Sequence, residues 1–131
     1  MILIDTNIIA DVFGGSAVWA VRSEATLRAI DKGNAAIGPV VYAELAFGFQ
    51  DRQPLDAALL RMSIRLIDMG ADALFGAGRA HADYRARGGP RTSILPDFFI
   101  GAHATSLGCP LLTRDPARFK TAFPNLPLLH P

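Results

Sequence analysis

Four carboxylates occupy positions in the chain from which they could act together chemically. Two of them follow short apolar runs and two lie in the first turns of predicted helices; they are Asp5, Asp115, Glu44 and Asp97. In an open parallel sheet, the carboxyl ends of the strands and the starts of the following helices share one edge, where ligands bind. The four acids are therefore predicted to meet at that edge.

Such a group of acids would favour metal-assisted chemistry. Ionised carboxylates within a few ångströms repel each other, so some would be protonated at neutral pH unless a cation lay among them. Mg²⁺ and Mn²⁺ are hard cations that take oxygen ligands and keep several waters. They lower the pKa of a bound water and stabilise charge on a phosphate. The pattern thus predicts a metal site that hydrolyses phosphodiesters.

Each acid also has an ordinary structural explanation. Asp115 precedes Pro116 and is typical of a helix cap, and Asp97 is typical of a first-turn acid that faces the helix dipole. Asp5 could belong to a polar turn, and Glu44 could be a solvated helix residue. The neighbours of Glu44 are mainly apolar, however, which makes a charge without a function less favourable there. Spacing alone leaves the metal site and these separate roles both open.

Apolar runs of strand length alternate with helical segments along the chain. Strands are expected at residues 1–4, 35–37, 64–68, 111–113 and 126–129. Helices are expected at residues 8–13, 16–33, 40–49, 55–62, 71–87 and 98–107, with a short one after Asp115. This alternation predicts an α/β single domain, residues 1–131, whose central parallel sheet of four to five strands carries helices on both faces.

Two helices carry more specific signals. The helix at 98–107 is preceded by Pro96 and Asp97 and followed by Gly108, a combination typical of a helix start and stop. In the helix at 16–33, the apolar side expected to pack on the core is formed by Val18, Val21, Ala25, Leu27 and Ile30. The first of these helices also carries one candidate acid, Asp97, at its head.

Composition limits the class of protein but does not select a partner. Half of the residues are hydrophobic, which fits either a fully covered parallel sheet or an apolar face reserved for another protein. The net charge is +1, and Cys109 is the only cysteine, so a reducing compartment and a cytoplasmic location are expected. No run approaches the roughly 18 apolar residues of a membrane span, so no membrane association is predicted.

Four segments in order along the chain carry a family resemblance. They are Ile-Asp-Thr-Asn at 4–7, Val-Tyr-Ala-Glu-Leu at 41–45, Leu-Pro-Asp-Phe-Phe-Ile-Gly-Ala-His-Ala at 95–104 and Leu-Leu-Thr-Arg-Asp at 111–115. Together they resemble the PIN-domain ribonucleases, and among these the VapC-type toxins of bacterial toxin–antitoxin (VapBC) modules. The resemblance implies a PIN-like fold and cleavage of RNA by a metal-activated water, with Mg²⁺ or Mn²⁺ as cofactor.

The same resemblance assigns roles to residues and partners. It implies Asp5, Glu44, Asp97 and Asp115 as the catalytic acids. Asp5 and Asp97 would bind the metal directly, and the other two directly or through water. Thr6, Asn7 and Thr113 match positions that line or support such a site. The implied partners are an RNA substrate, a cognate antitoxin and a second copy of the chain in a homodimer.

Several residues near these segments have two interpretations. Arg114 could contact substrate phosphate or be a solvated charge, and Arg85, Arg87 and Arg91 could form a basic rim for the RNA backbone. The aromatic residues of the early helices, Trp19, Phe47 and Phe49, are expected in the core; under the resemblance, exposed apolar residues there would bind the antitoxin or a second toxin. His103 is expected to be a core or supporting histidine.

Other functions fit the sequence less well. A receiver-like phosphoacceptor needs neighbouring acids after the first strand and a lysine near the last strand, but only Asp5 follows the first strand, and Lys32 and Lys120 are poorly placed. An Asp-x-Asp phosphatase is disfavoured by Asn7. A catalytically silent PIN module that only binds a partner is the remaining alternative, and the complete set of acids argues against it.

Overall fold

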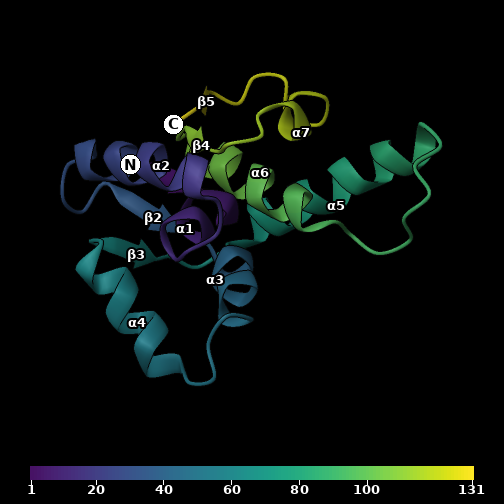
Figure 1. Cartoon of the computed structure of the whole chain (residues 1–131). Coiled ribbons are helices and arrows are strands. Elements are labelled where there is room, and N and C mark those ends of the chain that lie inside the picture. Colours follow the sequence, from purple (N-terminus) through teal and green to yellow (C-terminus); the bar gives the residue numbers. More distant parts are fainter.

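Five short parallel strands form the central sheet of the protein. The computed structural model describes residues 1–131. The strands are β1 (Ile2–Ile4), β2 (Ala35–Ile37), β3 (Ile64–Leu66), β4 (Leu111–Leu112) and β5 (Leu128–Leu129), in the spatial order β3-β2-β1-β4-β5. β1 is central, and Leu3 lies opposite both Ala36 and Leu111. The predicted parallel α/β sheet is confirmed (Figure 1).

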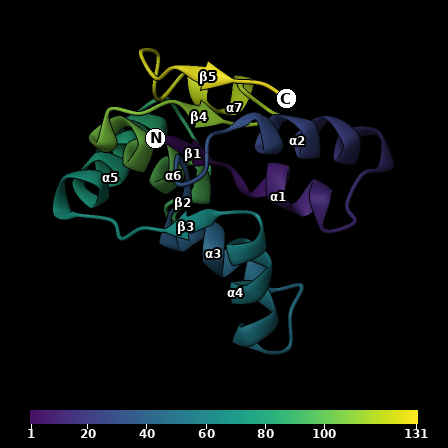
Figure 2. The same ribbon diagram turned by 90° about the vertical axis from the view of Figure 1, so that its left-hand side faces the viewer.

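Seven helices connect and cover these strands. They are α1 (Thr6–Val12), α2 (Ala17–Ala29), α3 (Pro39–Ala46), α4 (Arg52–Arg61), α5 (Ala71–Ala86), α6 (Pro96–Leu107) and α7 (Ala117–Lys120). Figure 2 shows α5 and α6 on one side of the sheet and α1 and α2 on the other. The strand residues Leu3, Ile4, Ile37, Leu111 and Leu112 are at most 1% exposed, as expected for a sheet covered on both faces.

α6 begins and ends where its sequence signals place it. Pro96 is in its first turn, and Gly108 follows it in the left-handed conformation, with φ of 63°, which only glycine adopts without cost. Gly101 faces the ring of Phe123, and a Cβ atom at this position would come within 2.3 Å of that ring. A glycine here lets the helix approach the chain after α7 closely, and this fixes Asp97 relative to α7.

The predicted apolar side of α2 is confirmed only in part, since Leu27 and Ile30 pack against the core whereas Val18, Val21 and Ala25 are exposed. The prediction that Val18 and Val21 face the core is wrong, because they are 77% and 73% exposed. The buried residue of this helix is Ser23, whose hydroxyl donates a hydrogen bond to Asp11 of α1 at 3.1 Å. A buried carboxylate needs such partners, so this polar pair sets the rotation of α2 on α1.

The element boundaries and one aromatic residue also differ from expectation. The predicted strands at 64–68 and 126–129 are only two or three residues long. Phe47 is 91% exposed, so its predicted core position is wrong; it follows the last turn of α3, which ends at Ala46. None of the helices has the length and apolar character needed to cross a membrane.

Candidate active site

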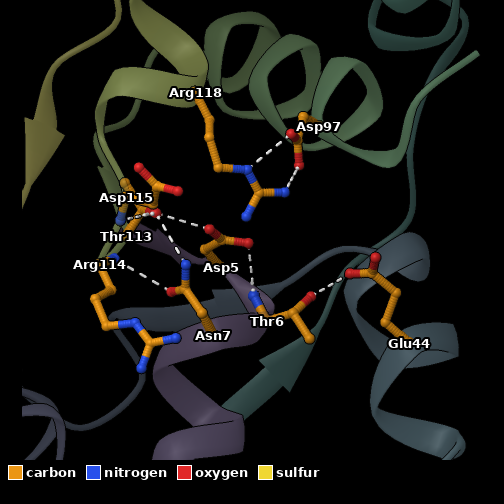
Figure 3. Close-up of polar contacts among 9 residues, drawn as sticks. All are labelled: Asp5, Thr6, Asn7, Glu44, Asp97, Thr113, Arg114, Asp115 and Arg118. Atoms are coloured by element: carbon orange, nitrogen blue, oxygen red, sulfur yellow. Dashed lines mark hydrogen bonds and ion pairs between the residues drawn. The ribbon is translucent and has the colours of Figure 1, made fainter. Parts of the chain in front are cut away.

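Asp5 lies at the centre of the candidate site, between the end of β1 and the start of α1. It is the N-cap of α1, and its Oδ1 accepts a hydrogen bond from the backbone N–H of Thr6 at 2.8 Å. Its Oδ2 accepts one from the hydroxyl of Thr113 at 2.7 Å (Figure 3). The carboxyl is only 2% exposed, and burial raises its pKa although these hydrogen bonds and Arg118 act in the opposite direction.

A small hydrogen-bond network joins Asp5 to the end of β4. Thr113 Oγ1 accepts the backbone N–H of Asp115 at 3.0 Å and the side-chain amide of Asn7 at 3.4 Å. Asn7 Oδ1 in turn accepts the backbone N–H of Arg114 at 3.2 Å. Two segments more than 100 residues apart in sequence are thus held in a fixed relation, and Asp115 is placed beside Asp5.

Asp97 and Arg118 form the second half of the site. Asp97 is in the first turn of α6. Arg118 of α7 donates two hydrogen bonds to its carboxylate, one from Nε to Oδ2 at 3.0 Å and one from Nη2 to Oδ1. Burial would lower the pKa of Arg118, but the hydrogen bond and charge of Asp97, with the charges of Asp5 and Asp115, outweigh burial and raise it. Figure 3 shows the guanidinium among these acids.

Glu44 approaches the site from the other side of Thr6. The hydroxyl of Thr6 donates a hydrogen bond to its carboxylate, so α3 is tied to the start of α1. Asp5 and Glu44 line one hollow of about 560 Å³, together with Thr6, Asn7, Arg114 and Arg118. We call it the acidic hollow. All four predicted acids thus come from different elements to one edge of the sheet (Figure 3).

The acids carry the donor chemistry of a magnesium or manganese site, although they are not gathered as ligands in this structure. No group of three or more histidine, cysteine, aspartate or glutamate side chains stands at metal-binding spacing. Arg118 provides the counter-charge instead, since its guanidinium faces three of the acids. All donors are carboxylate oxygens, which suit a hard divalent cation. The chemistry of the donors therefore fits such a metal, whereas in this structure Arg118 holds both oxygens of Asp97.

Arg118 is a residue of the site that the sequence motifs do not identify. The signal was nevertheless present, because four clustered acids require a compensating charge and Arg118 follows Asp115 by three residues in the same short segment. Asp11 was also missed. It is 2% exposed and is paired with Arg114 at 2.7 Å.

The other arginines near the site differ in whether their guanidinium groups have hydrogen-bond partners. The guanidinium of Arg114 is bound to Asp11 and lies 5.7 Å from the ring of Trp19, so its charge is largely compensated inside the fold. Arg85 donates hydrogen bonds to the backbone carbonyls of Gly89 and Arg91, so it supports the loop after α5. Arg87 is exposed and lines a second hollow beside Asp97.

Comparisons with known proteins give a consistent picture. The family model described as PIN domain matches residues 2–123. No curated protein matches the sequence significantly.

Several solved structures share the fold over nearly the whole chain. VapBC2 from Rickettsia felis, bound to a DNA fragment from its promoter, is 24% identical with a TM-score of 0.69, over 99% of this chain and 98% of that chain. VapBC-1 from nontypeable Haemophilus influenzae is 24% identical with a TM-score of 0.72 over the same shares. FitAcB from Neisseria gonorrhoeae is 20% identical with a TM-score of 0.72, over 98% and 96% of the chains.

Proposed function

Because the chain belongs to the PIN domain family, as its sequence motifs predicted, we propose that it is a metal-dependent endoribonuclease and the toxin of a toxin–antitoxin module. Nuclease activity is the general expectation for this family. One observation carries the proposal: Asp5, Asp97 and Asp115, from three distant segments, surround the guanidinium of Arg118. Glu44 lines the acidic hollow together with Asp5 and Arg118. Ionisable groups with shifted pKa values that cluster in this way are typical of functional sites.

The residues have distinct tasks in the proposed reaction. Asp5 and Asp97 would hold Mg²⁺ or Mn²⁺, and Glu44 and Asp115 would hold it directly or through water. A divalent cation here supplies a water of lowered pKa and stabilises the charge that develops on a phosphate. Thr113 and the Thr6 N–H keep the Asp5 carboxylate oriented, and the Thr6 hydroxyl orients Glu44. Such supporting bonds reduce the reorganisation that binding requires.

The proposed partners are RNA, an antitoxin and a second copy of the chain. The similar structures from Rickettsia felis and Haemophilus influenzae are VapBC complexes, which supports an antitoxin partner for this chain as well. Large apolar side chains are exposed on two sides of the molecule, among them Phe47 after α3 and Phe75 on α5, at 91% and 73%. Exposed apolar surface of this kind is typical of protein interfaces.

A manganese-supported RNase assay on purified full-length protein tests the proposal. Asp97→Asn should lower the rate of RNA cleavage by at least about 100-fold, because loss of supporting residues alone costs about 10–100-fold at metal sites. Asp72→Asn is the matched control, since Asp72 is also a first-turn helix acid, but of α5. Equal activity of wild type and Asp97→Asn would remove Asp97 from the mechanism. A wild type that binds its antitoxin but never cleaves RNA would favour the silent PIN module.

A further inference from the structure

Asp11 and Arg114 form an ion pair at the edge of the acidic hollow, and the proposed reaction does not use this pair. Both residues line the hollow together with Asp5 and Glu44. Nη1 of Arg114 lies 2.7 Å from Oδ1 of Asp11, whose side chain is only 3% exposed. Buried charges in proteins are paired or coordinate metals. Asp11 has its partner in Arg114, so the question is what this pair does for the site.

Helix α2 holds both members of the pair. The hydroxyl of Ser23 donates a hydrogen bond to Oδ2 of Asp11 at 3.1 Å. One turn earlier on the same helix, the ring centre of Trp19 lies 5.7 Å from the guanidinium carbon of Arg114. This distance is within the range of a cation–π interaction. The guanidinium is therefore fixed by a carboxylate of α1 and an aromatic ring of α2.

The backbone of Arg114, in contrast, lies within the site. Its N–H donates a hydrogen bond to Oδ1 of Asn7 at 3.2 Å. Its neighbours in the chain are Thr113, whose hydroxyl donates to Asp5, and Asp115. Figure 3 shows the guanidinium of Arg114 turned away from Asp5 and Asp115. The side chain thus begins among the acids, and Asp11 draws its charge away from them.

The ion pairs around the hollow show what a released Arg114 would meet. Each arginine of the hollow has one acid partner, which is Asp97 for Arg118 and Asp11 for Arg114. No direct ion pair involves the three remaining acids, which are Asp5, Glu44 and Asp115. Arginine carries several N–H donors and binds carboxylates strongly. A second guanidinium on these acids would occupy oxygens that a hard divalent cation needs.

We propose that Asp11 is a positioning residue of the metal site, which holds the guanidinium of Arg114 away from the three remaining acids and so keeps their oxygens accessible to a divalent cation. This inference rests on the proposed metal-dependent function. Asp11 is not itself a ligand, because its two oxygens accept hydrogen bonds from Arg114 and Ser23. Its effect on the metal passes through Arg114.

Calorimetric titration of the metal-free, full-length protein with Mn²⁺ tests this inference. Asp11→Asn keeps the shape of the side chain but removes its charge, and it should weaken Mn²⁺ binding about threefold to tenfold, within the range of coupling between contacting residues. Arg114→Gln should bind Mn²⁺ at least as tightly as wild type, because the competing guanidinium is absent. In the Arg114→Gln background, Asp11→Asn should no longer weaken Mn²⁺ binding.

The double variant separates positioning from two simpler effects. If Asp11 acted only through its own negative charge, or only by stabilising the fold, Asp11→Asn would weaken Mn²⁺ binding as much in the Arg114→Gln background as in wild type. That result overturns the inference, and so does equal Mn²⁺ affinity of Asp11→Asn and wild type. Thermal unfolding checks that each variant is folded. Should Asp11→Asn alone fail to fold, weaker Mn²⁺ binding by Arg114→Gln than by wild type overturns the inference, and binding as tight as wild type supports it.

A matched control removes a different acid from the same part of the fold. Glu24 of α2 pairs with Arg28 and does not line the acidic hollow, so Glu24→Gln should bind Mn²⁺ as wild type does. A wild type that binds no Mn²⁺ overturns both this inference and the metal site of the proposed function. A failed double-variant test in a protein that binds Mn²⁺ overturns only the role of Asp11 and leaves the metal site intact.

Discussion

At the scale of single residues, Arg118 occupies the carboxylates that the proposed divalent cation would need. The guanidinium is bonded to both oxygens of Asp97 and faces Asp5 and Asp115. Without it the acids would repel each other in the metal-free protein. With it, a metal ion must displace a cation that is already present. Arg118 therefore stabilises the metal-free protein, and under the proposed function the same contacts would weaken metal binding.

The first prediction concerns this competition. Arg118→Gln should bind Mn²⁺ about threefold to tenfold more tightly than wild type, because the ion no longer displaces a paired charge. The metal-free variant should at the same time melt at a lower temperature. Isothermal titration calorimetry and thermal unfolding measure the two effects. Arg28→Gln is the control, since Arg28 pairs with Glu24 away from the site and its loss should leave Mn²⁺ affinity unchanged. Unchanged or weaker Mn²⁺ binding by Arg118→Gln would contradict the competition.

His103 is a buried histidine whose hydrogen bonding is incomplete. It is 1% exposed, its Nε2 lies 3.1 Å from the backbone oxygen of Asp68, and its Nδ1 has no hydrogen-bond partner. Gly38 lies so close that a Cβ there would be 2.5 Å from Nδ1. Burial lowers the pKa of His103 below 6.5, and the hydrogen bond to Asp68 offsets this only in part. The neutral ring is therefore the form that fits the fold.

A pH dependence of stability follows from this lowered pKa. Between the unfolded value of 6.5 and the lower folded value, the unfolded chain binds more protons, so stability falls as the pH drops through this window. The contribution of one such group is at most about 1.4 kcal/mol per pH unit. Urea unfolding between pH 7.5 and pH 5 should show that the free energy of unfolding of His103→Gln falls less steeply with falling pH than that of the wild type. Parallel curves for the two proteins would exclude His103 as the source.

At the scale of elements, α6 and α2 show what local sequence can and cannot determine. α6 was bounded correctly because Pro96 and Gly108 act on the backbone within one turn. The exposure of Val18 and Val21 in α2 could not be predicted from the apolar pattern, because it depends on the contact of Ser23 with Asp11, a residue of another helix. In the site, the positions of the acids could be predicted from the ends of the predicted strands and the starts of the helices. The role of Arg118 could not, because it depends on which acids lie near its guanidinium in the folded structure.

Two helical glycines allow a matched test of close packing. Gly101→Ala should destabilise the protein by about 1–3 kcal/mol, because its new methyl group would meet the Phe123 ring of a packed interior. Gly78→Ala should stabilise it by about 0.5–1 kcal/mol, since nothing lies within 4 Å of a Cβ there and alanine favours the helix. Melting temperatures should shift by roughly 3–6 °C per kcal/mol for a chain of this size. Equal effects of the two changes would show that Gly101 has no special packing role.

At the scale of the whole molecule, the candidate site exists only in the folded chain. Its acids come from residues 5, 44, 97 and 115, and they are brought together by the parallel order of β1, β2 and β4. An unfolded chain holds them too far apart to bind one ion together. Metal binding at this site should therefore be coupled to folding of the entire domain rather than to the ordering of one loop.

This coupling gives the last prediction, which needs no enzyme assay. At a Mn²⁺ concentration about 100 times the dissociation constant, binding to the native state alone should add about 2.7 kcal/mol to the free energy of unfolding. At roughly 3–6 °C per kcal/mol, the melting temperature should rise by about 8–16 °C, and EDTA should reverse the rise. Asp97→Asn should lose most of this increase, whereas Asp72→Asn should keep it because Asp72 heads a different helix. If the melting temperature of the wild type does not change with Mn²⁺, Arg118 remains paired with Asp97 and the four acids do not form a metal site.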